Sequence, residues 1–172
     1  MQALHALDEA VRGEAVARAS APFAQKLGDV PALRNQLPDV MWEGVGVRRD
    51  AGGLQRGLQR IDEIDDALSS TGVAADNLAF NLSWHDWLNL RSLVDMSRVI
   101  AQSALSRAHS RGAHFREDHP DAGAMQDSYF TLATGSDKNI SVARAPVQFP
   151  IVKPGETLRG ADEAETVVGA AE

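Results

Sequence analysis

The sequence contains no cysteine among its 172 residues. This absence excludes disulfide bonds, cysteine-ligated zinc, iron–sulfur ligation and thiol nucleophiles. Basic residues are also few: 17 Lys and Arg stand against 24 Asp and Glu, which gives a formal net charge of −7. Proteins that bind nucleic acid or anionic membranes usually carry an excess of basic residues, so we expect neither property here.

Long hydrophobic runs are missing as well. No stretch approaches the roughly 18 consecutive apolar residues that a transmembrane helix needs. The N-terminal residues 1–19 carry charges and lack the apolar core of a signal peptide. We therefore expect a cytoplasmic protein that does not insert into a membrane. The length is sufficient for one domain with a hydrophobic core.

Four segments carry the apolar periodicity of amphipathic helices. The first, residues 2–20, has only a narrow, alanine-rich apolar stripe. The second follows Asp29, which is suited to cap a helix N-terminus. Because proline removes a hydrogen bond from a helix interior, Pro38 predicts two short helices here, at residues 31–37 and 38–45.

The third and fourth segments predict longer helices. Residues 50–69 give the strongest signal, because apolar residues recur there every three or four positions: Leu54, Leu58, Ile61, Ile64 and Leu68. The fourth helix is predicted over residues 83–111. Ser83 and Asp86 would form a capping box at its start, and Gly112 would terminate it in a left-handed conformation.

After Pro120 the pattern becomes alternating. Residues 128–134 and 139–147 are predicted strands joined by a loop at residues 135–138, with four candidate buried positions: Phe130, Leu132, Ile140 and Val142. Residues 159–172 are acidic, small and free of aromatics, so we expect disorder there. The sequence thus predicts a mainly α fold, in which an N-terminal helix and an antiparallel three-helix bundle precede a C-terminal β-hairpin or extended arm.

The densest polar cluster runs from His109 to Pro120 and admits three interpretations. His109, His114 and His119 could bind a metal beside two carboxylates, although a spacing of five places them on different helix faces and matches no known motif. The favoured interpretation is a helix exit, in which Gly112 ends the helix and the arginines pair with carboxylates or free carbonyls. The third, compatible with the second, is that these charges dock onto another domain or subunit.

Two other features also favour a structural interpretation. Trp84 and Trp87 could form a ligand platform, but hydrophobic packing at the end of the bundle is favoured. Residues 41–46 contain only G-x-G, without the third glycine and the preceding strand of a dinucleotide-binding fold. Since the sequence has no nucleophile elbow, phosphate loop or metal motif, its residues alone indicate a structural or interaction module.

Three motifs resemble those of one family in their order and spacing. Residues 110–120, SRGAHFREDHP, resemble the S-R-G-A-H-x-R-E-D-x-P signature of the succinate dehydrogenase and fumarate reductase flavoproteins, a family that includes L-aspartate oxidase. Residues 41–54 resemble the family's M-W-x-x-V-G-x-x-R-D-x-x-G-L, and residues 90–107 resemble the long helix that precedes the signature. The resemblance covers about residues 30–155.

The resemblance implies a C-terminal domain, made of a three-helix bundle and an extended β segment. In that family, the FAD-binding and capping domains come earlier in the chain and supply the flavin site and the catalytic residues. The resemblance therefore implies no catalytic, cofactor-binding or metal-ligating residue in this chain. It gives the signature a structural or interface role in an ion-paired turn, formed by Arg111, Gly112, His114, Arg116, Glu117 and Asp118.

The predicted organisation is an N-terminal helix and linker over residues 1–29, a flavoprotein C-terminal helical domain over 30–158 and an acidic tail over 159–172. The first part could be the end of an FAD-binding domain. The implied partners are FAD-binding and capping domains, in cis or in trans, and an iron–sulfur subunit, which would place the protein beside the inner membrane. Whether the chain is an enzyme stays open, because the family is FAD-dependent but this sequence lacks the parts that perform hydride transfer. We expect this chain alone to bind no flavin.

Two alternatives to this assignment remain. The chain could be a free-standing helical adaptor that kept the bundle and lost the enzyme context. It could also be a metal-dependent enzyme that uses the three histidines of the polar cluster.

Overall fold

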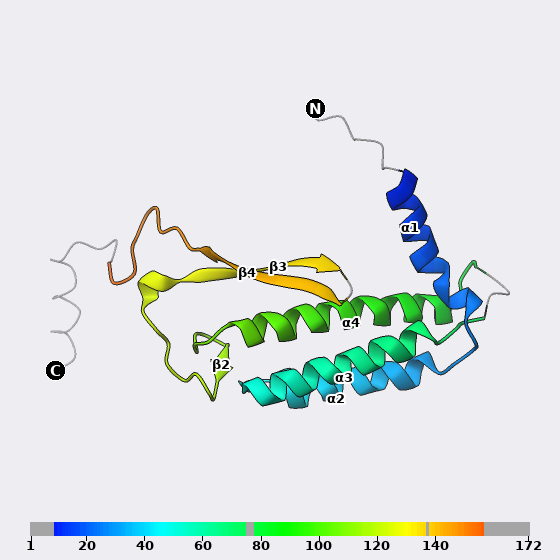
Figure 1. Ribbon diagram of the computed structural model, residues 1–172, viewed down its shortest axis with the longest axis horizontal. Helices are drawn as coiled ribbons and strands as arrows, with labels where there is room; N and C mark the ends of the chain where they lie inside the picture. The colour runs from blue at the N-terminus through cyan, green and yellow to red at the C-terminus, as the bar shows by residue number, and fades with distance from the viewer. Residues whose placement is uncertain (1–8, 75–77, 137, 157–172) are drawn as a thin grey trace, which may run out of the picture.

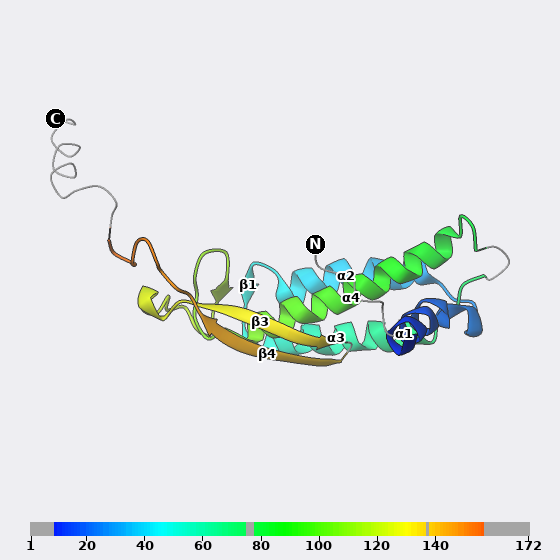
Figure 2. The same ribbon diagram turned by 90° about the horizontal axis from the view of Figure 1, so that it is seen from above.

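The computed structural model describes residues 9–74, 78–136 and 138–156. Its helices and strands are α1 (Glu9–Ser20), η1 (Ala21–Ala24), α2 (Val30–Val45), β1 (Arg48–Arg49), α3 (Ala51–Ser69), α4 (Leu82–Ser106), β2 (Phe115–Arg116), η2 (Met125–Asp127), β3 (Tyr129–Ser136) and β4 (Asn139–Pro146). Helices α2, α3 and α4 pack side by side as a bundle, and the β3–β4 hairpin lies along α4 (Figures 1 and 2). This arrangement confirms the predicted fold class.

The hydrophobic core lies between the three bundle helices. Four of the five predicted stripe residues of α3 are fully buried, and Leu58 is partly buried. Trp87 of α4 joins this core, and its indole N–H donates to the carbonyls of Leu68 (3.1 Å) and Thr71 (3.0 Å). Trp84 packs on Phe23 with ring centroids 5.2 Å apart. The packing interpretation of the two tryptophans is confirmed, because both fill space between helices.

Glycines allow α2 and α3 to approach closely. A Cβ added to Gly44 of α2 would lie 2.9 Å from the Cα of Gly57 in α3 and 3.1 Å from the carbonyl oxygen of Gly53. Real Cβ atoms essentially never come that close to backbone, so any side chain at Gly44 would force the two helices apart.

The predicted break at Pro38 is wrong, since α2 is one continuous helix from Val30 to Val45. Pro38 is exposed, so the carbonyl that loses its helical hydrogen bond lies on the solvent side of the helix. The neighbouring Leu37 is buried in the core and holds the helix in place on both sides of the proline. The predicted N-cap Asp29 is confirmed, because its side chain accepts from the N–H of Ala32 at 2.9 Å.

Both ends of α4 differ from the prediction. Asn81, rather than Ser83, caps the N-terminus by accepting from the N–H of Trp84 at 2.9 Å. The helix ends at Ser106, and Arg107 already has extended backbone angles. Gly112 does adopt positive φ (56°), but it lies in a later turn and does not terminate the helix. The expected helix end at residue 111 is therefore wrong by one to two turns.

The two predicted strands do pair as an antiparallel hairpin, but the predicted loop at residues 135–138 is wrong, because β3 continues to Ser136, which pairs with Asn139. The hairpin also exposes the opposite face of β3. Phe130 and Leu132 are exposed, so the expectation that they are buried is wrong, whereas Ile140 and Val142 are half-buried. The face of β3 that contains Thr131 is directed at α4, where Arg107 donates to the threonine hydroxyl at 3.0 Å. Apolar residues occur on both faces of the hairpin, and alternation alone does not tell which face is covered.

The N-terminal helix α1 has no buried residue and stands away from the bundle in Figure 1. It is tied to α4 by an ion pair between Arg18 and Asp95 at 2.9 Å. The expected helical residues 1–8 and the expected disorder of 159–172 lie outside the described residues. Among the described helices, none is long and apolar enough to cross a bilayer.

Candidate functional site

The SRGAHFREDHP segment connects the end of α4 to the hairpin and folds back on the start of α3. Its strand β2 pairs in parallel with β1, with Arg48 opposite Phe115 and Arg49 opposite Arg116. The backbone N–H of Glu117 extends this pairing by donating to the carbonyl of Arg49 at 2.7 Å. The two family-like motifs, far apart in sequence, are thus hydrogen-bonded to each other.

Arg116 belongs to β2, and its guanidinium lies against the C-terminal end of α4. The side chain is only 2% exposed. Its Nη1 donates to three carbonyls at 3.1 to 3.2 Å: those of Ala104, Leu105 and Arg107. The last carbonyls of a helix have no partner within the helix and carry a partial negative charge. The buried guanidinium therefore satisfies these carbonyls, and they help to stabilise its charge.

The other edge of the same guanidinium binds Asp118. Nε and Nη2 of Arg116 each donate to one oxygen of Asp118 at 2.7 Å, which is the two-pronged geometry of a strong ion pair. Asp118 also accepts from the backbone N–H of Ala51, the first residue of α3, at 2.9 Å. Hydrogen bonds from Arg116, and then from Ala51, hold the pKa of Asp118 well below its usual range. We call this linkage the Arg116–Asp118 clamp; it joins the negative end of α4 to the positive end of α3.

Arg111 and Gly112 form the turn before β2. Arg111 and His114 exchange two backbone hydrogen bonds, at 2.8 and 3.0 Å, around Gly112. The Arg111 side chain donates to the carbonyl of Ala122 at 2.5 Å, to the carbonyl of Ala124, and to the hydroxyl of Ser128 at 2.9 Å. Arg111 thus holds the chain that leads into β3, while Glu117 forms an ion pair with Arg48 on the opposite side.

Two histidines lie side by side next to the only tyrosine, with His109 and His114 ring centroids 6.3 Å apart. Nε2 of His109 faces Nη2 of Arg107, and its Nδ1 faces the Tyr129 hydroxyl, both at 3.2 Å. Nδ1 of His114 faces Nη1 of Arg49 at 3.1 Å. Because arginine can only donate, the facing imidazole nitrogens must accept, and both histidines are neutral in this arrangement.

The electrostatic surroundings agree with neutral histidines. Burial lowers the pKa of His109, and the positive charges of three arginines lower it further: Arg107, Arg111 and Arg144. Burial also lowers the pKa of His114, and the charge of Arg49 adds to this effect. Two of the arginines stack on the Tyr129 ring, with the guanidinium carbon of Arg107 at 4.9 Å and that of Arg144 at 4.6 Å from the centroid. We call Arg49, Arg107, His109, His114, Tyr129 and Arg144 the Tyr129 cluster.

Sequence reasoning missed Tyr129, Arg49, Arg107 and Arg144 as neighbours of the histidines, because the strand pairing and the hairpin bring them together. It also missed a buried ion network between α3 and α4. Arg98 is 1% exposed and donates from Nη2 to Asp62 at 2.8 Å and to Asp65 at 2.7 Å. Helix spacing could have placed Arg98 on the buried face of α4, because it lies four positions after Val94. From the sequence alone, however, an arginine at this position is normally taken to be exposed to solvent.

The arrangement gives no support to a metal-dependent enzyme. Within the described ranges, no three histidine or carboxylate side chains come together in a way that could hold a metal ion. Both nitrogens of His109 face other side chains, and His119 is exposed.

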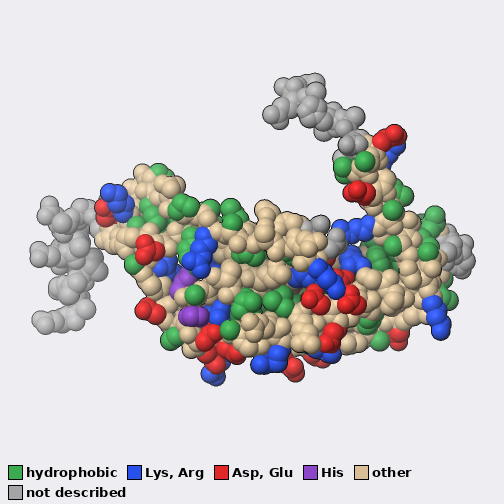
Figure 3. Space-filling view, viewed as in Figure 1, with side chains coloured by type: hydrophobic (Ala, Val, Ile, Leu, Met, Phe, Trp, Pro, Cys, Tyr) green, Lys and Arg blue, Asp and Glu red, His purple; other side chains and the backbone are tan. Residues whose placement is uncertain are grey.

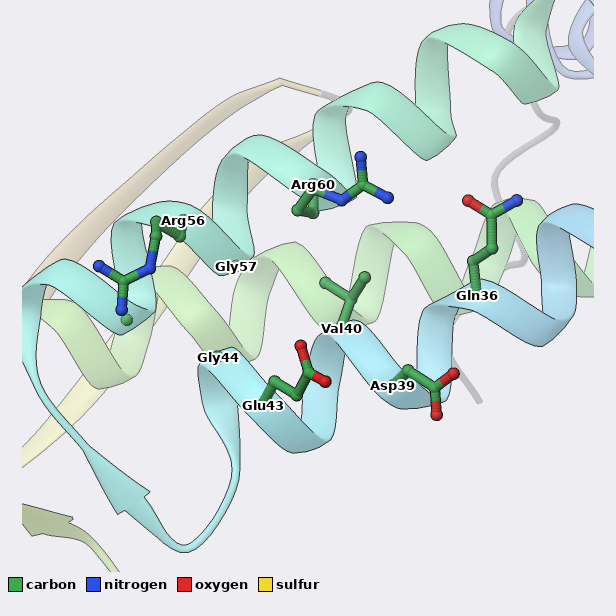
Figure 4. Close-up of a pocket in the computed structure, with 9 residues that line it drawn as sticks. Gln36, Asp39, Val40, Glu43, Gly44, Arg56, Gly57 and Arg60 are labelled. Carbon is green, nitrogen blue, oxygen red and sulfur yellow. The ribbon is translucent and has the colours of Figure 1, made fainter.

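Two further features bear on the dinucleotide-binding alternative: the G-x-G segment and a groove between α2 and α3. Gly44 and Gly46 lie at the end of helix α2 with no strand before them, so the G-x-G sequence does not form the strand–turn–helix that holds a dinucleotide. A groove of about 460 Å³ lies between α2 and α3 (Figure 4). Acidic side chains of α2 line it opposite Arg56 and Arg60 of α3, and Arg60 pairs along its own helix with Glu63. This mixture of charges favours no one class of ligand.

The fold is a three-helix bundle followed by the β3–β4 hairpin. The buried side chain of Arg116 lies at one end of the bundle and links α4 to α3 through Asp118. Residues 34–158 match the sequence model of the family described as fumarate reductase flavoprotein C-term. The chain therefore belongs to this family of C-terminal domains of succinate dehydrogenase and fumarate reductase flavoproteins. The family resemblance predicted from the three motifs is confirmed.

Individual relatives agree with this assignment. The chain is 29% identical over 140 residues to a fumarate reductase flavoprotein subunit of Haemophilus influenzae, which covers 81% of this chain and 23% of that protein. It is 41% identical over 86 residues to L-aspartate oxidase 1 of Ralstonia nicotianae, which covers 50% of this chain and 15% of that protein.

Solved structures show the same fold. Mycobacterium smegmatis Sdh1 in complex with UQ1 superposes with a TM-score of 0.71 at 26% identity, over 87% of this chain and 26% of that chain. E. coli quinol fumarate reductase FrdA superposes with a TM-score of 0.77 at 21% identity, over 91% of this chain and 27% of that chain. The chain thus spans about a quarter of the length of these relatives.

Proposed function

We propose that this chain is the helical C-terminal part of an FAD-dependent oxidoreductase of the succinate dehydrogenase and fumarate reductase type. Its role is to pack against the FAD-binding and capping domains and to offer surface to a partner subunit, such as an iron–sulfur subunit. On its own it binds no flavin and carries out no hydride transfer. It works in the cytoplasm, beside the inner membrane through its partners.

The observation that carries this proposal is an uncovered apolar stripe on α4. Leu93, Met96 and Ile100 are 48%, 57% and 45% exposed, and their spacing of three and four puts them on one face of the helix. The core face of the same helix is apolar as well, and a helix that is apolar on several sides is normally buried in a larger structure. The remaining three quarters of a flavoprotein would supply the cover.

The test is association with a flavin-binding part. The chain is co-expressed with the adjacent reading frame or with a family member that lacks this domain, and the complex is assayed for flavin absorbance and fumarate reduction. We expect Met96→Glu to abolish co-purification, because a carboxylate in a buried apolar contact is costly. Met125→Glu is the matched control: Met125 is 55% exposed but lies in η2, away from the stripe, so its complex should form normally.

A parent chain that associates with neither flavin-binding part would reject the docking role. The free-standing adaptor would then be the better assignment. Equal association of the Met96→Glu and Met125→Glu variants would reject the α4 stripe as the docking face.

A further inference from the structure

The arginines of the Tyr129 cluster have no carboxylate partner among the residues that the structure describes. Arg49 donates to the Val45 carbonyl and to His114, Arg107 donates to Thr131 and His109, and Arg144 donates to the Ser106 carbonyl. Two positive charges therefore lie on the ring of Tyr129 and a third lies against His114, and none of the three is paired with a described carboxylate. This is unexpected in a chain whose net charge is −7.

Four carboxylates near the cluster in sequence already accept hydrogen bonds from other groups, and Asp127, two positions before Tyr129, is exposed in η2. Asp118 is held by Arg116 and the Ala51 N–H, Glu117 pairs with Arg48, and two others accept from backbone N–H groups, namely Asp50 from Gly53 and Asp121 from Gly123. The two neutral histidines add no negative charge. Within the described ranges, no carboxylate, Asp127 included, forms an ion pair with an arginine of the cluster.

The geometry of the cluster is organised and does not depend on freely moving surface side chains. Arg107 and Arg144 stack on the same ring, and Arg107 is also fixed by hydrogen bonds to Thr131 and His109. The buried Nε–H of Arg107 has no acceptor in the described part of the chain. Figure 3 shows histidine side chains at the surface near one end of the molecule, beside Lys and Arg side chains. Guanidinium groups held in this way can bind a carboxylate with two parallel hydrogen bonds.

We propose that the Tyr129 cluster is a binding site for a carboxylate group, and that its occupant in the assembled protein is an acidic side chain of the flavin-binding part. The identity of the occupant rests on the proposed function, whereas the carboxylate chemistry rests on this chain alone. Like-charged arginines repel each other, so an acidic side chain placed among them gains attraction to several cations at once. The site would thus set the orientation of the domain, while the apolar stripe of α4 supplies contact area.

The chemistry is tested on the chain alone, because its single tyrosine gives one set of ring signals by NMR after selective ¹³C labelling. Sodium acetate is titrated at constant ionic strength, with sodium chloride and sodium phosphate in parallel. We expect a saturable shift of the Tyr129 signals with acetate, and an apparent affinity about tenfold weaker in Arg144→Gln, which corresponds to the loss of one charged partner. Arg144→Lys keeps the charge and should bind with an intermediate affinity.

Arg56→Gln is the matched control, since it removes a positive charge from the α2–α3 groove and should bind acetate like the parent chain. A shift that does not saturate with acetate would overturn the site. Tighter binding of phosphate than of acetate would overturn its carboxylate chemistry.

The occupant is tested in the complex with the flavin-binding part. We expect Arg144→Gln to weaken association about fivefold or more and to reduce its dependence on salt, as the loss of an interfacial charge pair does. Unchanged affinity of Arg144→Gln, together with lost binding of Met96→Glu, would overturn the occupant and leave the docking role standing. If the parent chain does not associate, the docking role fails, and the acetate titration still decides whether the site binds carboxylates.

Discussion

Arg116 combines two tasks that a smaller cation could not perform together. One edge of its guanidinium is directed at three carbonyls of α4, and the other binds both oxygens of Asp118. A lysine ammonium has one charged nitrogen on a flexible stem, so it could serve the carbonyls or the carboxylate but would lose the two-pronged geometry. The side chain therefore fixes the angle at which the turn leaves the bundle.

At the residue scale, we predict that Arg116→Gln lowers the free energy of unfolding by about 1–3 kcal/mol, because it removes a buried guanidinium and leaves the carbonyls at the end of α4 unsatisfied. Arg116→Lys should fall between this variant and the parent. Urea unfolding followed by far-UV circular dichroism measures the change. Arg12→Gln, which breaks an exposed pair with Glu9, serves as control and should stay within about 0.5 kcal/mol of the parent. An Arg116→Gln variant as stable as this control would mean that the clamp is not needed for stability.

At the scale of elements, the close approach of α2 and α3 decides the shape of the bundle. The Gly44 contact leaves no room for a methyl group, while Gly53 and Gly57 face it from the neighbouring helix. Glycine is a poor helix former, and three glycines at this contact weaken both helices. Their presence is explained by the packing, since larger residues would separate the helices and open the core around Val45 and Leu54.

We predict that Gly44→Ala destabilises the bundle by about 1–3 kcal/mol, the usual cost of overpacking a tight contact, despite the better helix propensity of alanine. Differential scanning calorimetry would show a lower Tm. The control is Gly13→Ala in α1, where the new methyl group meets nothing within 4 Å. Gly13→Ala should leave the Tm unchanged or raise it; a rise of the Tm in Gly44→Ala would contradict the packing argument.

At the scale of the whole molecule, the Tyr129 cluster makes stability depend on pH. Its histidines have a native pKa below the value of about 6.5 that they take in the unfolded chain. Between the two values the unfolded state binds more protons, so acidification favours unfolding. The stabilisation that the two neutral histidines contribute is complete above about pH 6.5. It is lost as the pH falls through the lower pKa values that the histidines have in the native state.

We therefore predict that the Tm falls between pH 7.5 and pH 5, a window that stays above the ordinary titration of aspartate, with a pKa of about 3.9. The double variant His109→Gln with His114→Gln should show a flatter profile, because the titrating groups are gone. His85→Gln changes an exposed histidine outside the cluster and should keep the parent profile. Thermal melts at half-unit pH intervals measure all three. A parent Tm that rises on acidification would refute the neutral-histidine assignment.

Sequence periodicity was sufficient for the fold class and for the approximate position of the bundle helices, but not for the C-terminal end of α4. Hydrophobic spacing is a local property, so Leu54 to Leu68 marked the buried face of α3 directly, and Asp29 marked the start of α2. The same local reasoning failed at Pro38, where tertiary packing overrides the propensity of one residue. It also failed at Phe130 and Leu132, because both faces of the hairpin are apolar enough to be covered.

The sequence by itself determined three absences: of cysteine, of an excess of basic residues and of long apolar runs. It also determined the family, because the order and spacing of motifs can be read along the chain without a structure. The tertiary structure decided which charges meet. Arg116 finds its carbonyls on α4 and its carboxylate beside α3. Tyr129 is contacted by arginines from the end of α4 and from β4, while Arg49 of β1 faces His114. Arg116 and Asp118 are only two positions apart, but the other contacts join residues far apart in the chain, and only strand pairing and helix packing bring such residues together.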